Sequence, residues 1–426
     1  MKFDLLHPRE QLVQIMNRIY RYGLTTTSGG NLSILDENGD LWITPSAVDK
    51  GDLKQRDIMC VKPDKRIIGP HQPSSECPFH QMIYEKRPDV RAIVHAHSPA
   101  LVSFSIARRI PDTRIIPQAH HVCGQVGYAP YALPGSPPLG ENIAQTFAQG
   151  FDVVLLENHG VVTAGPDLLT AFQRLETLDF CACTQIRACS LGPVHTLTDE
   201  QIARFEDYRS TLPTFQPRRH SSRERELRQQ ICRMVHRAYE QRLMTSTEGT
   251  ASARVNAEEF LITPYGVDRK YLEIEDIVLV KNGHTEQGKR PSRAVELHQV
   301  IYADHPDVNC IITAQSPNAM AYAVTGQPLD SKTIPESYVV LRNVPLVPHG
   351  QQYDAPEQIS AAISKNSPAV LIQNDTVLTT GTSVHQAFDR LEVADFTALS
   401  LLNTLPIGPL VPIGEAEGQQ LEEKFG

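Results

Sequence analysis

Apolar residues recur at helical spacing near the start of the chain and then in short β-branched runs. The spacing of Leu12, Ile15 and Ile19 predicts an amphipathic helix. This helix spans residues 8–22 and ends at Gly23, a residue type common at helix C-termini. Strands are predicted at 31–35, 41–45, 58–62, 92–98 and 152–157, and further helices at 75–86, 138–149 and 167–190. This order predicts the α/β class, with a central sheet flanked by helices.

The whole pattern occurs twice, at an offset of about 219 residues. Residues 41–62 (LWITPSAVDKGDLKQRDIMCVK) return as 260–281 (FLITPYGVDRKYLEIEDIVLVK). Three more pairs follow in the same order, namely 73–99 with 291–317, 154–165 with 370–381, and 171–180 with 387–396. Four matches in one order predict two copies of one domain.

A stretch with prolines, charges and little apolar periodicity separates the two copies, which is typical of a linker. We therefore expect one domain at 1–210, a linker at 211–223 and a second domain at 224–426.

Composition narrows the classes of protein. A chain of 426 residues that is 41% hydrophobic and 21% charged is typical of a globular protein with about two or three domains. The formal net charge of -9 argues against a nucleic-acid partner. Near the start there is no apolar segment typical of a signal peptide, and nowhere do ~18 apolar residues run together. We expect a cytoplasmic protein without a membrane segment.

Three histidines and one glutamate stand at places where the chain should be well ordered. In the strand predicted at 92–98, His95 and His97 are two residues apart and should project to the same face. His159 follows another strand in an Asn-His-Gly turn, and Glu76 opens a helix. Three imidazoles and one carboxylate suit Zn²⁺, and a carboxylate that leaves the ion can act as a base.

The second copy has lost all four of these side chains together. Thr313 and Gln315 replace the strand histidines, Asp375 replaces the turn histidine, and Ala294 replaces the glutamate. The apolar framework is kept. Core histidines have no reason to change as a set, whereas the ligands of a lost metal site do. We therefore expect one zinc ion per chain, in the first domain only.

Small polar residues in the first copy are typical of a phosphate site. A Gly-rich turn lets backbone N–H groups approach an anion, and free N–H groups and hydroxyls at a helix N-terminus bind phosphate. The candidates are Ser28, Gly30, Asn31, Ser46, Ser74 and Ser75. In the second copy Glu248 would repel a phosphate and Tyr265 would fill the space. We expect that copy not to bind the phosphate end of a sugar.

In this order and spacing, the segments TSGGNLS, ITPSAV, PSSE, HAHSP and NHGVVTAG resemble the class II aldolase/adducin-like family, and within it the L-fuculose- or L-rhamnulose-phosphate aldolase type. The resemblance spans the first copy and, without the site residues, the second. It implies two tandem α/β domains, each with a central, mostly antiparallel sheet flanked by helices.

The resemblance also implies roles for individual residues. Zn²⁺ would be held by His95, His97, His159 and Glu76, with Glu76 also the catalytic base. The phosphate contacts would be Ser28, Gly30, Asn31, Ser46, Ala47, Ser74 and Ser75, where Ala47 replaces a glycine of the family. The implied activity is that of a metal-dependent aldehyde-lyase. It would cleave a ketose 1-phosphate to dihydroxyacetone phosphate and an aldehyde such as lactaldehyde.

The general acid is where this chain departs from the family, in which a neighbouring subunit delivers a tyrosine. The segment PQAHHVCG carries His120 and His121 at that place, and the second copy has Tyr338 opposite His120. The family packs as a ring of four. Two tandem chains would build that ring as a homodimer, or the protein would form a higher oligomer. The expected acid is Tyr338 from the second copy, or else one of the two histidines.

Four other functions share this scaffold. Sugar-phosphate epimerases use the same histidines but carry aspartate at the place of Glu76, which favours the aldolase. Dehydratases and decarboxylases of sugar phosphates stay open, because each begins by polarising a carbonyl. A non-catalytic, adducin-like scaffold predicts that every copy has lost its ligands, whereas here only the second copy has.

Overall fold

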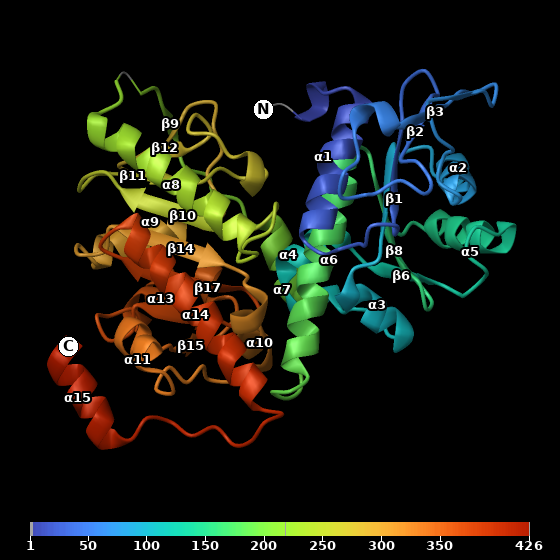
Figure 1. Ribbon diagram of the computed structural model, residues 1–426. Coiled ribbons are helices and arrows are strands. Elements are labelled where there is room, and N and C mark those ends of the chain that lie inside the picture. The colour runs from blue at the N-terminus through green and yellow to red at the C-terminus, as the bar shows by residue number, and fades with distance from the viewer. Residues whose placement is uncertain (1–2, 218, 426) are drawn as a thin grey trace. The chain divides into compact units, whose positions relative to one another are not determined.

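The computed structural model describes residues 3–217 and 219–425, and the chain folds into two compact units (Figure 1). Unit 1 comprises Met1–Thr113 and Ala119–Cys183, and unit 2 comprises Arg114–Gln118 and Thr184–Gly426. Each unit contains one sheet with flanking helices, as expected from the repeat. Within the described residues, no helix combines the length and the apolar composition that crossing a bilayer requires.

The sheet of unit 1 runs in the order β4-β3-β2-β1-β5-β8-β7-β6. Its neighbours are antiparallel except for the parallel pair β6 and β7, which confirms the expected mostly antiparallel sheet. The strands are β1 (Asn31–Leu35), β2 (Leu41–Ile43), β3 (Met59–Val61), β4 (Ile67–Ile68), β5 (Ala92–Ala96), β6 (Val126–Ala129), β7 (Val153–Leu156) and β8 (Gly160–Gly165). Because β5 lies between β1 and β8, its side chains are well buried.

Helices cover both faces of this sheet (Figure 1). They are α1 (Pro8–Arg21), α2 (Cys77–Lys86), α3 (Pro99–Ile106), α4 (Pro117–Cys123), α5 (Pro137–Ala148) and α6 (Leu168–Ala188). On one face, α2 and α5 contribute Phe79, Ile83 and Phe147 to the core. On the other face, the buried guanidinium of Arg18 in α1 lies 4.3 Å from the ring of Phe172 in α6. Packing of these apolar faces, more than helix propensity, stabilises the helices.

Unit 2 repeats this sheet in the order β15-β16-β17-β14-β10-β11-β12-β13-β9. Its strands are β9 (Thr214–Phe215), β10 (Thr250–Arg254), β11 (Glu259–Ile262), β12 (Val278–Lys281), β13 (His284–Glu286), β14 (Cys310–Ala314), β15 (Leu346–Val347), β16 (Ala369–Ile372) and β17 (Thr376–Gly381). The pairs β9–β13 and β15–β16 are parallel and the other pairs are antiparallel. Strand β9 lies inside the segment predicted as the linker, so part of that segment forms an edge of the second sheet.

The helices of unit 2 follow the same plan. They are α7 (Asp199–Asp207), α8 (Ser222–Glu240), α9 (Val295–Asp304), α10 (Pro317–Thr325), α11 (Pro335–Leu341), α12 (Gln351–Asp354), α13 (Pro356–Ala362), α14 (Val384–Thr404) and α15 (Glu415–Phe425). Residues Ile301 of α9 and Ile359 of α13 share one hydrophobic core with the sheet. Helix α14 packs against β14 and β17, and α8 packs against β10.

Two details of unit 1 matter for the site. The helix predicted at 8–22 is α1, and Gly23 after it has φ +66°, as a C-terminal glycine should. The strand predicted at 92–98 is shorter, because Ser98 already caps α3 and β5 ends at Ala96. His97 therefore lies just beyond the strand, so the alternation of side chains between the two faces of the sheet does not fix the direction of its side chain.

Candidate metal centre

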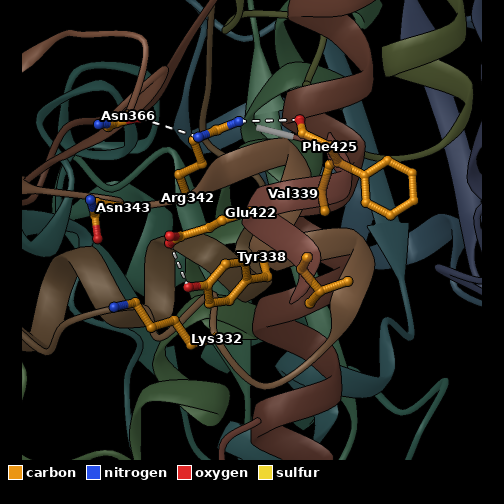
Figure 2. Close-up of a pocket in the computed structure, with 9 residues that line it drawn as sticks. Lys332, Tyr338, Val339, Arg342, Asn343, Asn366, Glu422 and Phe425 are labelled. Atoms are coloured by element: carbon orange, nitrogen blue, oxygen red, sulfur yellow. Dashed lines mark hydrogen bonds between the residues drawn. The ribbon is translucent and has the colours of Figure 1, made fainter. Parts of the chain in front are cut away.

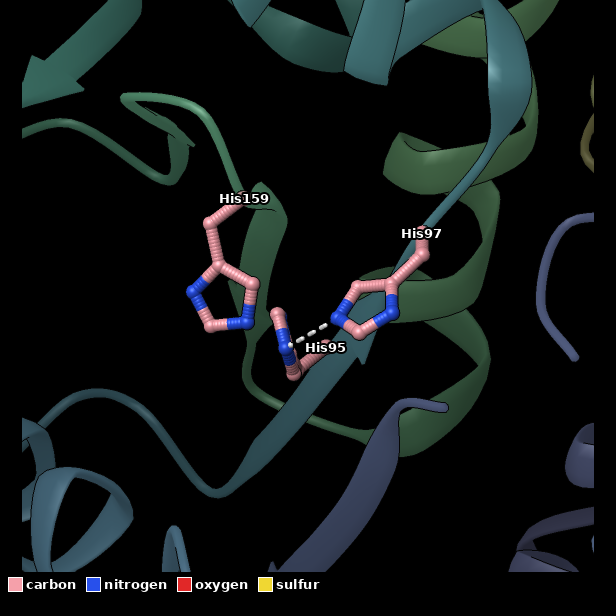
Figure 3. A group of neighbouring side chains, drawn as sticks. All are labelled: His95, His97 and His159. Atoms are coloured by element: carbon pink, nitrogen blue, oxygen red, sulfur yellow. Dashed lines mark hydrogen bonds between the residues drawn. The ribbon is translucent and has the colours of Figure 1, made fainter. Parts of the chain in front are cut away.

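His95 comes from β5, where the neighbouring strands bury its ring completely. Its Nδ1 lies 3.0 Å from the carbonyl oxygen of Val161, which can only accept, so Nδ1 donates and Nε2 keeps its lone pair. Figure 3 shows His97 turned toward the same point, with its Nε2 3.0 Å from Nε2 of His95. The two rings present their nitrogens to one place although only His95 lies within the strand.

His159 reaches the same place from the hairpin between β7 and β8 (Figure 3). Before it, Asn158 has φ +53°, a left-handed conformation that asparagine tolerates. After it, Gly160 permits a close approach, since a Cβ there would lie 2.6 Å from the carbonyl oxygen of Ala96 and 2.8 Å from the His97 ring. The ligand nitrogens of the three histidines gather within 4.8 Å of one another.

Glu76 completes the group from the N-terminus of α2, where it is the N-cap residue. Its Oε2 lies 3.3 Å from Nε2 of His95 and its Oε1 lies 3.7 Å from Nε2 of His159. The Nδ1 atom of His159 is buried and has no hydrogen-bond partner among the described residues. Three imidazoles beside one carboxylate are the donor set of a catalytic divalent ion such as Zn²⁺, so these residues fit a metal.

Burial keeps the three rings uncharged. It lowers the pKa of His95 well below the usual value, with smaller contributions from the other two rings. It lowers the pKa of His97 to about 4. Burial also lowers the pKa of His159, although Glu76 acts in the opposite direction. Neutral imidazole is the form that binds metal ions, so all three rings are ready to act as ligands at neutral pH.

The residues predicted to hold phosphate lie in three turns at the same end of the sheet. The backbone N–H of Ser74 donates to the carbonyl oxygen of Thr44 at 3.1 Å, and that of Ser46 to Gln72 at 2.9 Å. The turn with Gly30 joins them through β1, because the Thr44 N–H donates to Leu32. Exposed positions in these turns are Ser28, Ala47 and Ser75, and the buried ones are Gly30, Asn31 and Ser74. The structure thus brings the predicted segments together beside Glu76.

Ala47 has a backbone conformation that favours glycine. Ala47 has φ +55°, and the corresponding residue of the second copy is Gly266, with φ +74°. Lys50, which is buried beside this turn, was not predicted from the sequence. Its Nζ donates to the carbonyl oxygen of Pro45 at 2.6 Å, and burial lowers its pKa to about 8. The repeat holds a signal for it, since Arg269 occupies the same position in the second copy.

The side chain of Asn31 was expected to contact phosphate, but it is hydrogen-bonded within the protein. Its Nδ2 donates to Oε2 of Glu76 at 2.7 Å, and its Oδ1 lies 2.5 Å from Nε2 of His80. The amide is therefore taken up by a carboxylate and a buried histidine. His80 was missed from the sequence, although it lies four residues after Glu76 and hence on the same face of α2.

The three candidates for the general acid lie on helices that correspond in the repeat. His120 and His121 are on α4, and Nδ1 of His120 is 3.1 Å from Oγ1 of Thr113. Tyr338 is on α11, and Figure 2 shows it lining a pocket of unit 2 next to Glu422 of α15. The Tyr338 hydroxyl donates to Oε1 of Glu422 at 2.8 Å, and this hydrogen bond raises the pKa of the tyrosine.

At the corresponding place in unit 2, two of the residues that replace the ligands are hydrogen-bonded to each other, and one of them also to Glu248. The backbone N–H of Gln315 donates to Glu248 at 3.0 Å, and its Nε2 donates to the carbonyl oxygen of Asp375 at 2.9 Å. Burial raises the pKa of Glu248 to about 8 and that of Asp375 to about 7. Within the described part of the chain, only the three histidines of unit 1 form a group of metal-ligand type.

Comparisons with known proteins agree with two copies of one domain. Residues 10–186 and 229–402 each match the family described as Class II Aldolase and Adducin N-terminal domain. An L-fuculose phosphate aldolase of Methanocaldococcus jannaschii is 34% identical over 172 residues, which cover 40% of this chain and 91% of that protein. A 3-oxo-tetronate 4-phosphate decarboxylase of Haemophilus influenzae is 33% identical over 178 residues, which cover 41% of this chain and 84% of that protein.

A solved structure of an L-fuculose 1-phosphate aldolase shares 32% identity with a TM-score of 0.42, and the match covers 46% of this chain and 92% of that one. The matches to single relatives thus span about half of this chain, whereas the family matches two regions that together make up most of it. The protein therefore belongs to the class II aldolase and adducin N-terminal domain family and carries that domain as a tandem duplication.

Proposed function

We propose that unit 1 is a metal-dependent aldehyde-lyase, an aldolase that cleaves a ketose 1-phosphate of the fuculose or rhamnulose type. The products would be dihydroxyacetone phosphate and an aldehyde such as lactaldehyde. The observation that carries the proposal is the gathering of Glu76 with three uncharged histidines around one point. The similarity to an L-fuculose phosphate aldolase supports the same reaction.

The residues of the site divide the chemistry between them. His95, His97 and His159 would hold the ion, Zn²⁺ in this proposal, which when bound supplies Lewis-acid stabilisation of negative charge. In cleavage, the C4 hydroxyl gives up its proton, the C3–C4 bond breaks, and C3 of the dihydroxyacetone phosphate fragment takes up a proton. Glu76 would deliver the proton to C3 in cleavage and remove it in synthesis. Its side chain is only 11% exposed, which limits competing water.

We place the phosphate of the substrate where the three turns meet. Exposed hydroxyls and N–H groups there can donate hydrogen bonds to an anion. The buried polar groups hold the turns in place. The proposed contacts are Ser28, Gly30, Asn31, Ser46, Ala47, Ser74 and Ser75. Of these, Asn31 would only border the phosphate, because its amide is engaged by Glu76 and its backbone pairs with His95 in the sheet. The buried cation Lys50 adds favourable charge beside the turn.

For the proton of the C4 hydroxyl we propose Tyr338 of a second chain, with His120 or His121 as the alternative. These residues come from α4 and α11, which occupy the same place in the two copies. Two chains with two copies each would close a ring of four, so the proposed assembly is a homodimer. In that ring the second unit of one chain would line the metal centre of the other chain and supply its general acid, although the second unit has no metal centre of its own.

A decarboxylase is the second candidate, because the similarity to a 3-oxo-tetronate 4-phosphate decarboxylase is as strong as that to the aldolase. Both reactions leave negative charge on a carbon next to a carbonyl, so one metal centre suits both. An epimerase is less favoured since Glu76 is not an aspartate, and a dehydratase has no observation of its own in support. An adducin-like scaffold has no need of the intact ligand set of unit 1.

A substrate panel tests the proposal. The chain loaded with Zn²⁺ is incubated with fuculose, rhamnulose and ribulose 1-phosphates and with 3-oxo-tetronate 4-phosphate. Release of dihydroxyacetone phosphate is measured with a coupled dehydrogenase, and release of CO₂ is measured separately. We expect dihydroxyacetone phosphate from at least one ketose phosphate. Decarboxylation of 3-oxo-tetronate 4-phosphate also yields dihydroxyacetone phosphate, so release of CO₂ together with that product from this substrate, with none of the ketose phosphates cleaved, would establish the decarboxylase. No product from any substrate with a metal-loaded chain would refute both reactions.

A further inference from the structure

A chain of buried hydrogen bonds leads away from Glu76 into the interior of unit 1. Asn31 bridges Glu76 and His80, as described above. On the far side of the ring, Nδ1 of His80 lies 2.7 Å from Oγ of Ser33, and the same Oγ lies 2.7 Å from the Tyr84 hydroxyl. The His80 and Ser33 side chains are fully buried, and Asn31 and Tyr84 are less than a tenth exposed.

The local structure explains why these five residues meet. Glu76, His80 and Tyr84 are spaced four residues apart, so they follow one face of α2 and of its N-cap. Asn31 and Ser33 are two residues apart on β1 and project to one face of the sheet. The helix face packs on the strand face, and the polar side chains of the two alternate along the contact.

The hydrogen bonds can run in one direction only. A carboxylate accepts but cannot donate, so the Asn31 amide turns its Nδ2 to Glu76 and its Oδ1 to His80. The Oδ1 atom also only accepts, so Nε2 of His80 carries the hydrogen. Burial lowers the pKa of His80 to about 3, and the neutral ring must then accept from Ser33 through Nδ1. Ser33 in turn accepts from Tyr84.

The second copy keeps the inner part of this chain and has lost the outer part. Oγ of Ser252 lies 2.7 Å from Nδ1 of His298 and 2.7 Å from the Tyr302 hydroxyl, as in unit 1. Thr250 stands in place of Asn31, and its hydroxyl is 2.6 Å from that of Ser292. Nε2 of His298 is buried and has no hydrogen-bond partner among the described residues.

The comparison separates packing from function. Both copies fold around a buried histidine at this position, so the fold does not require a partner for its Nε2 atom. That partner is present only in the copy that has the carboxylate. Buried donors are normally paired. In unit 2 the Nε2–H of His298 is unpaired because Thr250 stands where unit 1 has Asn31.

We propose that His80 is a positioning residue, whose Nε2–H orients Asn31 so that the amide holds Oε2 of Glu76 and leaves Oε1 facing the histidine cluster. The importance of this for catalysis rests on the proposed function, in which Glu76 moves the proton. Groups that orient the ligands of a metal site commonly change metal affinity or activity by 10- to 100-fold when they are removed. His80 would act at one remove further, through Asn31.

The test compares His80→Leu with His298→Leu, a matched change in the other copy. His80→Gln is the conservative variant, because its amide nitrogen can replace the Nε2–H donor. The full chain is loaded with Zn²⁺ for kcat and KM, and with Co²⁺ for the visible absorption of the metal centre. Circular dichroism and the melting temperature confirm that each variant is folded.

We expect His80→Leu to lower kcat by about 10-fold or more with KM nearly unchanged, and to alter the Co²⁺ spectrum. His80→Gln should recover most of the loss, and His298→Leu should leave kcat and the spectrum as in the wild type. The inference is overturned if folded His80→Leu keeps kcat within about twofold, or if His80→Gln is no better. Equal losses in the two leucine variants would also overturn it, since they would indicate packing alone.

Two further measurements keep the test decisive. If His80→Leu does not fold, the milder pair Ser33→Ala and Ser252→Ala takes its place, and only Ser33→Ala should lower kcat. If the wild type cleaves none of the substrates, the proposed function fails and the Co²⁺ spectrum alone decides. A spectrum changed by His80→Leu but not by His298→Leu would then support the inference, and an unchanged spectrum would overturn it.

Discussion

The two copies differ in the residues that surround the point where the histidines of unit 1 meet. Gly29 of unit 1 lies against His97, and a Cβ on it would come within 2.8 Å of the imidazole Nδ1. In unit 2 the corresponding residue is Glu248, and its carboxylate accepts from the backbone N–H of Gln315, the residue that replaced His97. The space that serves a ring in one copy thus holds an acid side chain in the other.

The framework around that point is the same in both copies. The antiparallel pairing of β1 with β5 returns as that of β10 with β14, and the buried Ser–His–Tyr contacts return as well. The fold therefore does not depend on the metal ligands, because unit 2 forms the corresponding sheet without them. A change in one copy can accordingly be controlled by the matched change in the other.

The largest effect is expected from removing two ligands. His95→Ala combined with His97→Ala should reduce bound zinc from about one ion per chain to almost none. Activity should fall by on the order of 10³-fold, because the charge stabilisation that the ion supplies amounts to several kcal/mol. Metal analysis of the purified chain measures this. Thr313→Ala with Gln315→Ala is the control, and a double histidine variant that keeps its metal would contradict the assignment.

Next comes the proposed base. Glu76→Gln should lower kcat by about 10²- to 10⁴-fold, the usual contribution of a general acid–base, while the three histidines still retain metal. Steady-state kinetics and metal analysis together distinguish this from simple loss of the ion. Glu248→Gln in the second copy should leave kcat unchanged. Comparable losses in the two variants would show that the copies share the chemistry.

The third effect concerns the part that unit 2 takes in the reaction. Tyr338→Phe removes the proposed acid and should lower kcat by about 10²-fold, with zinc content and oligomeric state unchanged. His120→Phe and His121→Phe, measured alongside, show whether a histidine has that role instead. Unchanged turnover of Tyr338→Phe with zinc still bound would eliminate the tyrosine.

A smaller effect concerns the stability of unit 2 against pH. Burial raises the pKa of Glu248 from its ordinary value of 4.5 to about 8, so in this window the folded chain holds a proton that the unfolded chain releases. Through this group, stability should fall as pH rises, by about 2 kcal/mol between pH 6 and 8, and Asp375, whose pKa burial raises to about 7, adds to the fall. Urea unfolding at the two pH values measures it.

Glu248→Gln should remove the Glu248 part of this pH dependence and leave that of Asp375, because the amide does not titrate. Glu423→Gln, a change at an exposed acid of α15, is the control and should leave the slope as it is. The same slope in all three proteins would show that Glu248 does not hold the proton.

The smallest effect concerns the stability of the turns that contain Ala47 and Gly266, which both have a positive φ. Ala47→Gly should stabilise unit 1 by about 0.5–1 kcal/mol, because alanine is strained at φ +55°. The reverse change, Gly266→Ala, should destabilise unit 2 by about 1 kcal/mol, since that residue has φ +74°. Thermal unfolding measures both. A loss of stability on Ala47→Gly would mean that the Ala47 side chain contributes contacts that outweigh the strain.

Much of the fold could be predicted because it follows from local patterns. The helix at α1, the central strand with His95 and the turn with His159 each carry their own periodicity or turn residues. The repeat adds a comparison within one chain, and the four candidate ligands stand out in it because they change together. The domain boundaries at 210 and 224 stay predictions, although β9 shows that the second sheet begins before residue 224.

By itself, then, the sequence determined that two copies of one α/β domain follow each other and that only the first has the residues of a metal centre. Tertiary structure decided how those residues are held. Asn31 faces Glu76 and His80 across the contact between β1 and α2. Glu248 fills the place vacated in unit 2. Such contacts join residues distant in the chain, and no local periodicity encodes which polar atom a buried side chain will meet.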